Sequence, residues 1–92
     1  MVYKHKAELK SRYIIELVLH DVGKSKKYPD GLKYSLICFD KKTKMKILMD
    51  NHHPKGHHIH IGKNEIRYNF KNSDKLFNDF KIIVFENLGV KI

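Results

Sequence analysis

The sequence predicts an α+β fold, in which a small antiparallel sheet of about four strands in meander order is covered on one face by a C-terminal amphipathic helix. Two observations predict it. Several segments before the C-terminal region alternate apolar with other residues at the period of a strand, and the period changes to that of a helix only near the C-terminus. Strands joined by few residues run antiparallel, and their apolar face needs a cover, which the helix supplies.

Strands are expected at 13–20, 32–40, 44–49 and 66–70. In the first, every second residue from Tyr13 to Leu19 is apolar, which suits a half-buried strand. Helical spacing of Leu9, Tyr13 and Leu17 is the rival interpretation, but the β-branched pair Ile14-Ile15 favours extended backbone. The Pro-Asp-Gly run at 29–31 predicts a tight turn before the second strand. Residues 1–11 are either a frayed tail or an edge element.

The helix is expected to begin after Asn72 or Ser73, which can cap it, and to end at Gly89. Asp74 would lie in the first turn, where a carboxylate meets the positive end of the helix. The residues at helical spacing that should face the sheet are Leu76, Phe77, Phe80, Ile83, Val84, Asn87 and Leu88. Phe39, Phe70, Phe77 and Phe80 are expected in the core.

A length of 92 residues predicts a single domain, 1–92. The net charge of +9 favours a polyanionic partner, nucleic acid foremost, with an acidic protein or an anionic membrane as alternatives. The single cysteine, Cys38, cannot form an internal disulfide, and we expect a small buried residue in a cytoplasmic protein. No apolar run has the roughly 18 residues that a membrane span needs, so no membrane partner is expected.

Five of the seven histidines lie within residues 50–60. On an extended segment, His58 and His60 project from the same face. Imidazole transfers protons near neutral pH and is also a common metal ligand. Metal-free RNA cleavage would use one histidine as the base for the 2′-hydroxyl and another as the acid for the leaving 5′-oxygen, while Lys55 offsets charge on the phosphate.

Other interpretations of the histidine segment stay open. His58 and His60 could bind zinc or nickel, with His52, His53 or Asp50 as a third ligand, in an open site, because a single cysteine excludes a closed thiolate site. The segment could also be a solvated loop, or could contact RNA or protein without catalysis.

The candidates for substrate binding are cations that reach phosphates, an aromatic ring that could stack on a base, and polar neighbours of the histidine pair. These residues are Lys33, Arg67, Tyr34, Asn51, His53 and His57. Tyr34 lies in a predicted strand, where packing in the core explains it equally well.

The segments 26–36 and 50–60, the strand ending in Tyr68-Asn69-Phe70 and the helical segment 76–80 together resemble the TumE family of small toxins from bacterial and archaeal toxin–antitoxin pairs. The resemblance covers about 18–85, and its specific part is Asp-Asn-His at 50–52 with Gly-His-His-x-His at 56–60. It implies a cytoplasmic toxin held inactive by an antitoxin, usually a helix-turn-helix protein. Family members often carry a longer first hairpin than residues 1–13 provide.

The same resemblance places five residues of this chain among the family's signature positions, and assigns Lys55 and Gly56 to the turn between them. The signature residues are Asp50, Asn51, His52, His58 and His60.

The leading hypothesis is a toxin that acts on RNA as a metal-independent endoribonuclease without a cofactor. Its catalytic residues would be His58, His60, His52, Asp50 and Lys55. The alternatives are a noncatalytic nucleic-acid or protein binding module and a histidine-rich metal-binding protein. RNA and an antitoxin are the expected partners, and a homodimer stays open.

Overall fold

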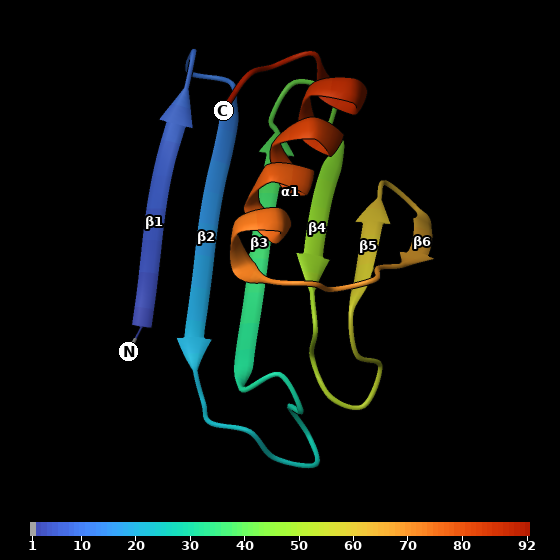
Figure 1. Cartoon of the computed structure of the whole chain (residues 1–92). Helices are drawn as coiled ribbons and strands as arrows, with labels where there is room; N and C mark the ends of the chain where they lie inside the picture. Colours follow the sequence, from blue (N-terminus) through green and yellow to red (C-terminus); the bar gives the residue numbers. More distant parts are fainter. Residues whose placement is uncertain (1) are drawn as a thin grey trace.

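The computed structural model describes residues 2–92 and shows one six-stranded antiparallel sheet with a helix across one face (Figure 1). The elements are β1 (Val2–Leu9), β2 (Tyr13–Asp21), β3 (Leu32–Asp40), β4 (Lys46–Asp50), β5 (His58–Ile61), β6 (Asn64–Arg67) and α1 (Ser73–Leu88). The spatial order of the strands equals their order in the sequence. The predicted α+β meander with a C-terminal helix is confirmed, but the sheet has more strands than the four expected.

The additional strands lie at the start of the chain and in the histidine segment. β1 is an edge strand that pairs with β2 along its whole length, from Val2 opposite His20 to Leu9 opposite Tyr13. β5 begins at His58, and a turn through Gly62, whose φ is 59°, leads directly into β6. Because this turn is short, the last strand occupies Asn64–Arg67 rather than 66–70, and the chain has left the sheet before it reaches α1.

Alternation along the strands divides the sheet into a covered face and an open face. Leu36, Met49 and Ile59 are cross-strand neighbours on the covered face, where all are buried. Phe80 of α1 is buried in the same core cluster. Phe39, which we expected in the core, pairs with Ile14 and Lys46 and is half-buried on the open face, because its position alternates with that of buried Cys38.

The helix ends are formed by the residues that the sequence predicted. Asn72 is the N-cap, and its side-chain oxygen accepts a hydrogen bond of 2.8 Å from the backbone N–H of Lys75. Gly89 adopts the left-handed conformation, with φ 71°, and its N–H donates to the carbonyl of Phe85. These bonds satisfy backbone groups that a helix end leaves unpaired.

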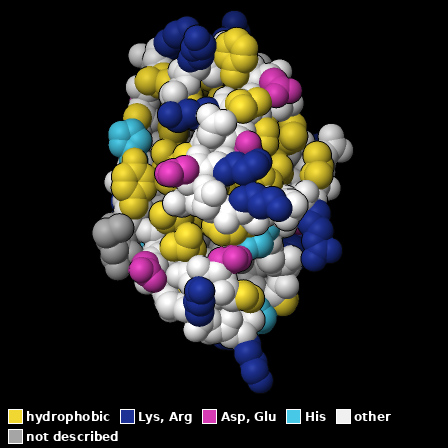
Figure 2. Space-filling model, in the orientation of Figure 1, with side chains coloured by type: hydrophobic (Ala, Val, Ile, Leu, Met, Phe, Trp, Pro, Cys, Tyr) yellow, Lys and Arg dark blue, Asp and Glu magenta, His cyan; other side chains and the backbone are white. Residues whose placement is uncertain are grey.

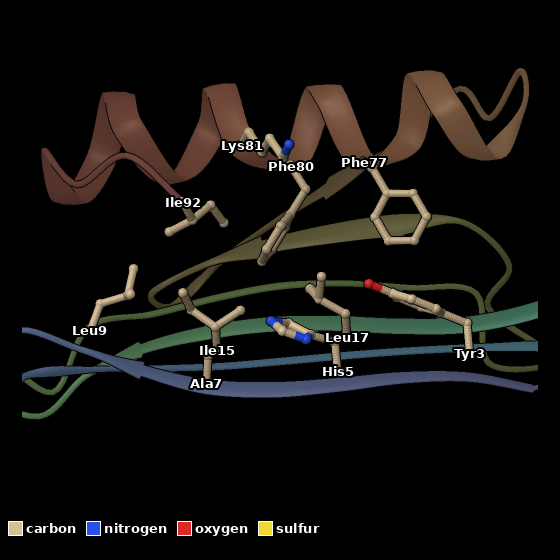
Figure 3. Close-up of a pocket in the computed structure, with 10 residues that line it drawn as sticks. All are labelled: Tyr3, His5, Ala7, Leu9, Ile15, Leu17, Phe77, Phe80, Lys81 and Ile92. Carbon is tan, nitrogen blue, oxygen red and sulfur yellow. The ribbon is translucent and has the colours of Figure 1, made fainter.

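α1 lies over β3 and β4, so an apolar groove remains beside it over β1 and β2 (Figures 1 and 3). Phe77 and Phe80 descend from the helix toward Tyr3, Ile15 and Leu17 on the strands (Figure 3). Figure 2 shows the same side of the molecule, where Lys and Arg are interspersed with Asp and Glu. The helix side is therefore not a uniformly basic surface.

A partly buried ion pair joins the β1–β2 turn to the end of β3. Both carboxylate oxygens of Asp40 accept hydrogen bonds of 2.8 Å from the guanidinium of Arg12, the last residue of the β1–β2 turn. The Lys42 N–H and the Thr43 hydroxyl, from the β3–β4 turn, also donate to this carboxylate. The Arg12 guanidinium, followed by these other donors, holds the pKa of Asp40 well below its usual range.

This ion pair predicts a specific acid sensitivity. A carboxyl whose pKa is lower in the folded than in the unfolded state contributes stability above its unfolded pKa, about 3.9, and this stability is lost as the pH falls toward the folded value. We expect Asp40→Asn to lower the urea midpoint at pH 7 and to flatten the fall in stability below about pH 4. Chemical denaturation across this range tests it, and parallel pH curves for the two proteins would contradict it.

Candidate functional site

The candidate site lies on the open face of the sheet, where β4, β5 and β6 adjoin. The register places Asp50 opposite His58 and His58 opposite Arg67. In the adjacent row His60 stands opposite Glu65. Because β5 alternates, Ile59 is buried in the core while His58 and His60 project from the other side.

His58 is held in one orientation by acceptors at both ring nitrogens. Its Nδ1 donates a 2.8 Å hydrogen bond to the carbonyl of Gly56, and its Nε2 lies 2.8 Å from Asp50 Oδ1 and 3.8 Å from Glu65 Oε1. The carbonyl can only accept, so Nδ1 carries a proton and Nε2 is the atom presented to the carboxylates. Asp50 Oδ1 is buried and receives no well-directed hydrogen bond from residues 2–92.

Glu65 connects the two histidines to a lysine. The rings of His58 and His60 meet edge to face, 4.7 Å apart, and His60 Nε2 lies 3.6 Å from Glu65 Oε1. The same oxygen accepts a 3.0 Å hydrogen bond from Lys55 Nζ, and this bond lowers the pKa of Glu65. The sequence did not predict that Glu65 belongs to the candidate site. The signal that could have found it is the short turn after β5, which pairs Glu65 with His60.

Two shallow hollows adjoin the cluster formed by Asp50, His58, His60 and Glu65, and both are lined by His57 and Arg67. One is lined by Lys55, His57, His58, Glu65 and Arg67. The other continues from Arg67 to Lys27 on the β2–β3 loop. This loop contacts the histidine segment through a 2.9 Å hydrogen bond between His57 Nε2 and Asp30 Oδ2. A strip of three cations, Lys55, Arg67 and Lys27, therefore runs from the imidazole pair across the two hollows.

Tyr34, His57 and Asn51 form the support behind the site. Tyr34 is 2% exposed, and burial raises the pKa of its hydroxyl, which lies 2.8 Å from His57 Nδ1. The buried side chain of Asn51 accepts a hydrogen bond from the Tyr34 N–H and donates one to the Leu32 carbonyl. His57 stacks on Phe70, 4.8 Å away. Of these three predicted substrate-binding residues, Tyr34 and Asn51 are buried in the protein, whereas His57 is partly exposed and lines both hollows.

The remaining predicted residues lie at varied distances from the cluster. His52 and His53 are exposed in the β4–β5 loop, and within residues 2–92 their side chains form no hydrogen bond or ion pair. Lys33 is on the open face of β3, two residues before Ser35, which pairs with Asp50. Cys38 is fully buried, and burial raises the pKa of its thiol to about 11, so it does not present a thiolate.

Comparison with protein families supplies the functional class. The family model described as Toxin TumE matches residues 2–87. The chain belongs to the TumE toxin family. Neither a search of curated proteins nor a search of solved structures found a match. Within residues 2–92 no helix has both the length and the apolar stretch required to cross a membrane.

The structure separates the residues that matched the TumE pattern into three groups. Asp50, His58 and His60 converge at the cluster. Asn51 forms buried hydrogen bonds behind it, and His52 lies exposed in the β4–β5 loop. One donor atom each from His58, His60 and Glu65 lies within 4.8 Å of the others. This arrangement can transfer protons, and it can also hold a cation.

The buried amide of Asn51 should be important for stability. Asn51→Ala removes a donor and an acceptor and leaves the Tyr34 N–H and the Leu32 carbonyl without their partner, which costs about 1–3 kcal/mol. The exposed neighbour His53 provides a matched control, because His53→Ala should change the free energy of unfolding by less than about 0.5 kcal/mol. Urea denaturation measures both, and equal midpoints would contradict a structural role for Asn51.

Proposed function

We propose that this TumE-family toxin cleaves RNA by metal-independent acid–base chemistry at the cluster of Asp50, His58, His60 and Glu65. The observation that supports the proposal is the meeting of two imidazoles from one strand with two carboxylates, on the face that the helix leaves open. Both histidines lie close enough to act on one phosphodiester. The hollow beside them leaves room for a substrate.

The orientation of the two rings suggests their roles. A His58 ring protonated at both nitrogens can donate to Gly56 and to Asp50 at once, so His58 is the acid that protonates the leaving 5′-oxygen. His60 is more exposed and takes the proton of the 2′-hydroxyl, whose oxygen then attacks phosphorus. The P–O5′ bond breaks, and the products are a 2′,3′-cyclic phosphate and a free 5′-hydroxyl.

The surrounding cations would bind the RNA backbone. Lys55 and Arg67 line the hollow beside His58, and Lys27 lines the adjoining one. Their charges would stabilise the negative charge that grows on the phosphate during the reaction. Lys33, on the open face of β3, would extend this contact along the strand. The shallow site favours single-stranded RNA, whose phosphates and 2′-hydroxyls can be laid against an open surface.

The family also points to an antitoxin as the protein partner. A helix-turn-helix type for that partner and a cytoplasmic setting stay predictions.

Cleavage of a fluorescent single-stranded RNA by antitoxin-free protein, in the presence of a chelator, tests the proposal. We expect His60→Ala to lower kcat/KM by about 10²–10⁴-fold, the usual contribution of one acid–base group. His53→Ala, in the nearby loop, is the matched control and should cleave as the wild type does. A substrate with a single 2′-deoxy nucleotide at the cleaved position should resist.

Two results would overturn the enzymatic proposal. One is an absence of cleavage of any RNA by folded wild-type protein. The other is cleavage that His58→Ala and His60→Ala leave unchanged. RNA binding that weakens with salt but is indifferent to both variants, without cleavage, would select a noncatalytic binding module instead.

A further inference from the structure

We propose that His58, His60 and Glu65 bind one divalent transition-metal ion of the zinc class, and that the bound ion switches the site off. The binding half of this inference is independent of the proposed function. The inhibitory half rests on it, because a switch needs an activity to act on.

The spacing of the donor atoms fits a single small cation. Ligands held about 2.0–2.1 Å from zinc in tetrahedral geometry lie roughly 3.3–3.4 Å from one another. Glu65 Oε1 lies 3.8 Å from His58 Nε2 and 3.6 Å from His60 Nε2. One donor atom from each of His58, His60 and Glu65 lies within 4.8 Å of the other two. Shifts of a few tenths of an ångström would bring the Glu65 oxygen to metal-binding separations from both histidines.

The hydrogen bonds around His58 are those of a metal ligand. Histidines that bind metals usually donate their second ring N–H to a carbonyl or carboxylate, which fixes the tautomer and directs the free nitrogen at the ion. His58 Nδ1 makes this bond to the Gly56 carbonyl. Its Nε2 then faces the buried Asp50 Oδ1, which has no well-directed hydrogen-bond donor within residues 2–92. A cation bound at Nε2 would also offset the negative charge of this neighbouring carboxylate.

The donor set selects the class of ion. Two imidazoles favour zinc, nickel or cobalt over calcium and magnesium, which prefer oxygen ligands alone. Lys55 already places an ammonium 3.0 Å from Glu65 Oε1, so this carboxylate attracts positive charge. The Lys55 side chain is 63% exposed and can swing into solvent when a metal ion takes its place.

The switch follows from the lone pairs of the imidazoles. A ring nitrogen bound to a metal cannot accept a proton from a 2′-hydroxyl, and it carries no proton to give to a leaving oxygen. The same ion would engage Glu65 and release Lys55 from it. Metal binding and metal-free proton transfer are therefore mutually exclusive at this cluster.

Titration of the full chain with Co²⁺ tests the binding half directly, because tetrahedral cobalt gives visible absorption bands without any need for activity. We expect one Co²⁺ ion per chain, and we expect Zn²⁺ to displace it. The affinity for Co²⁺ should fall at least about tenfold in His60→Ala and in Glu65→Gln, because loss of one ligand or of its charge weakens such a site. The matched control is His52→Ala/His53→Ala, which removes the two exposed loop histidines and should bind as the wild type does. Lys55→Ala should bind more tightly, because it removes the competing ammonium.

Binding that survives in His60→Ala and Glu65→Gln, or that is lost in the loop control, would overturn the site and identify adventitious binding by the loop. Both deciding variants change partly exposed side chains, and circular dichroism would verify that they fold. His58→Ala is not needed for the decision, since His58 is buried and its loss could unfold the chain.

RNA cleavage with and without stoichiometric Zn²⁺ tests the inhibitory half. Loss of cleavage on adding Zn²⁺, and its recovery with a chelator, would support the switch. Cleavage that needs Zn²⁺ would overturn the switch and the metal-free mechanism, but not the metal site. Cobalt binding at the cluster without cleavage under any condition would overturn the proposed function and the switch with it, while supporting the site.

Discussion

The burial of one face of the sheet under α1 is the constraint on which the rest of the structure depends. The helix side chains Leu76, Phe80 and Val84 pack into the same cluster as alternate residues of the central strands. Because successive side chains of a strand point to opposite faces of the sheet, burial of one face determines which residues lie on the open face. In β5 this puts Ile59 in the core and turns His58 and His60 to the open side.

The orientation of the histidine pair could be predicted because it depends only on residues that are close in the sequence. The spacing of His58 and His60 within an extended segment is enough to place them on one face, and the caps of α1 at Asn72 and Gly89 follow from local backbone chemistry. The alternation in the same segment also separates His57 from the pair. These features need no knowledge of distant parts of the chain.

The missed features depend on pairing between segments. All of the short strand β6 is exposed, so no apolar alternation marks its register, and only the hairpin geometry brings Glu65 to His60. Asp40 pairs with Arg12, which is 28 positions away in the sequence. From the sequence alone, Tyr34 and Asn51 could be either ligand-binding or structural residues. Their hydrogen bonds show that they hold β3 to the start of the β4–β5 loop. The sequence therefore predicted the histidine pair of the candidate site but not the groups that surround it.

We propose that this toxin binds its substrate on the open face of the sheet, around β4, β5 and β6. NMR chemical-shift mapping with a single-stranded oligonucleotide that carries 2′-deoxy sugars, and so cannot be cleaved, tests it most directly. The account predicts that the largest perturbations fall on Lys55, His58, His60, Glu65 and Arg67. Perturbations confined to α1 and the apolar groove over β1 and β2 would contradict it.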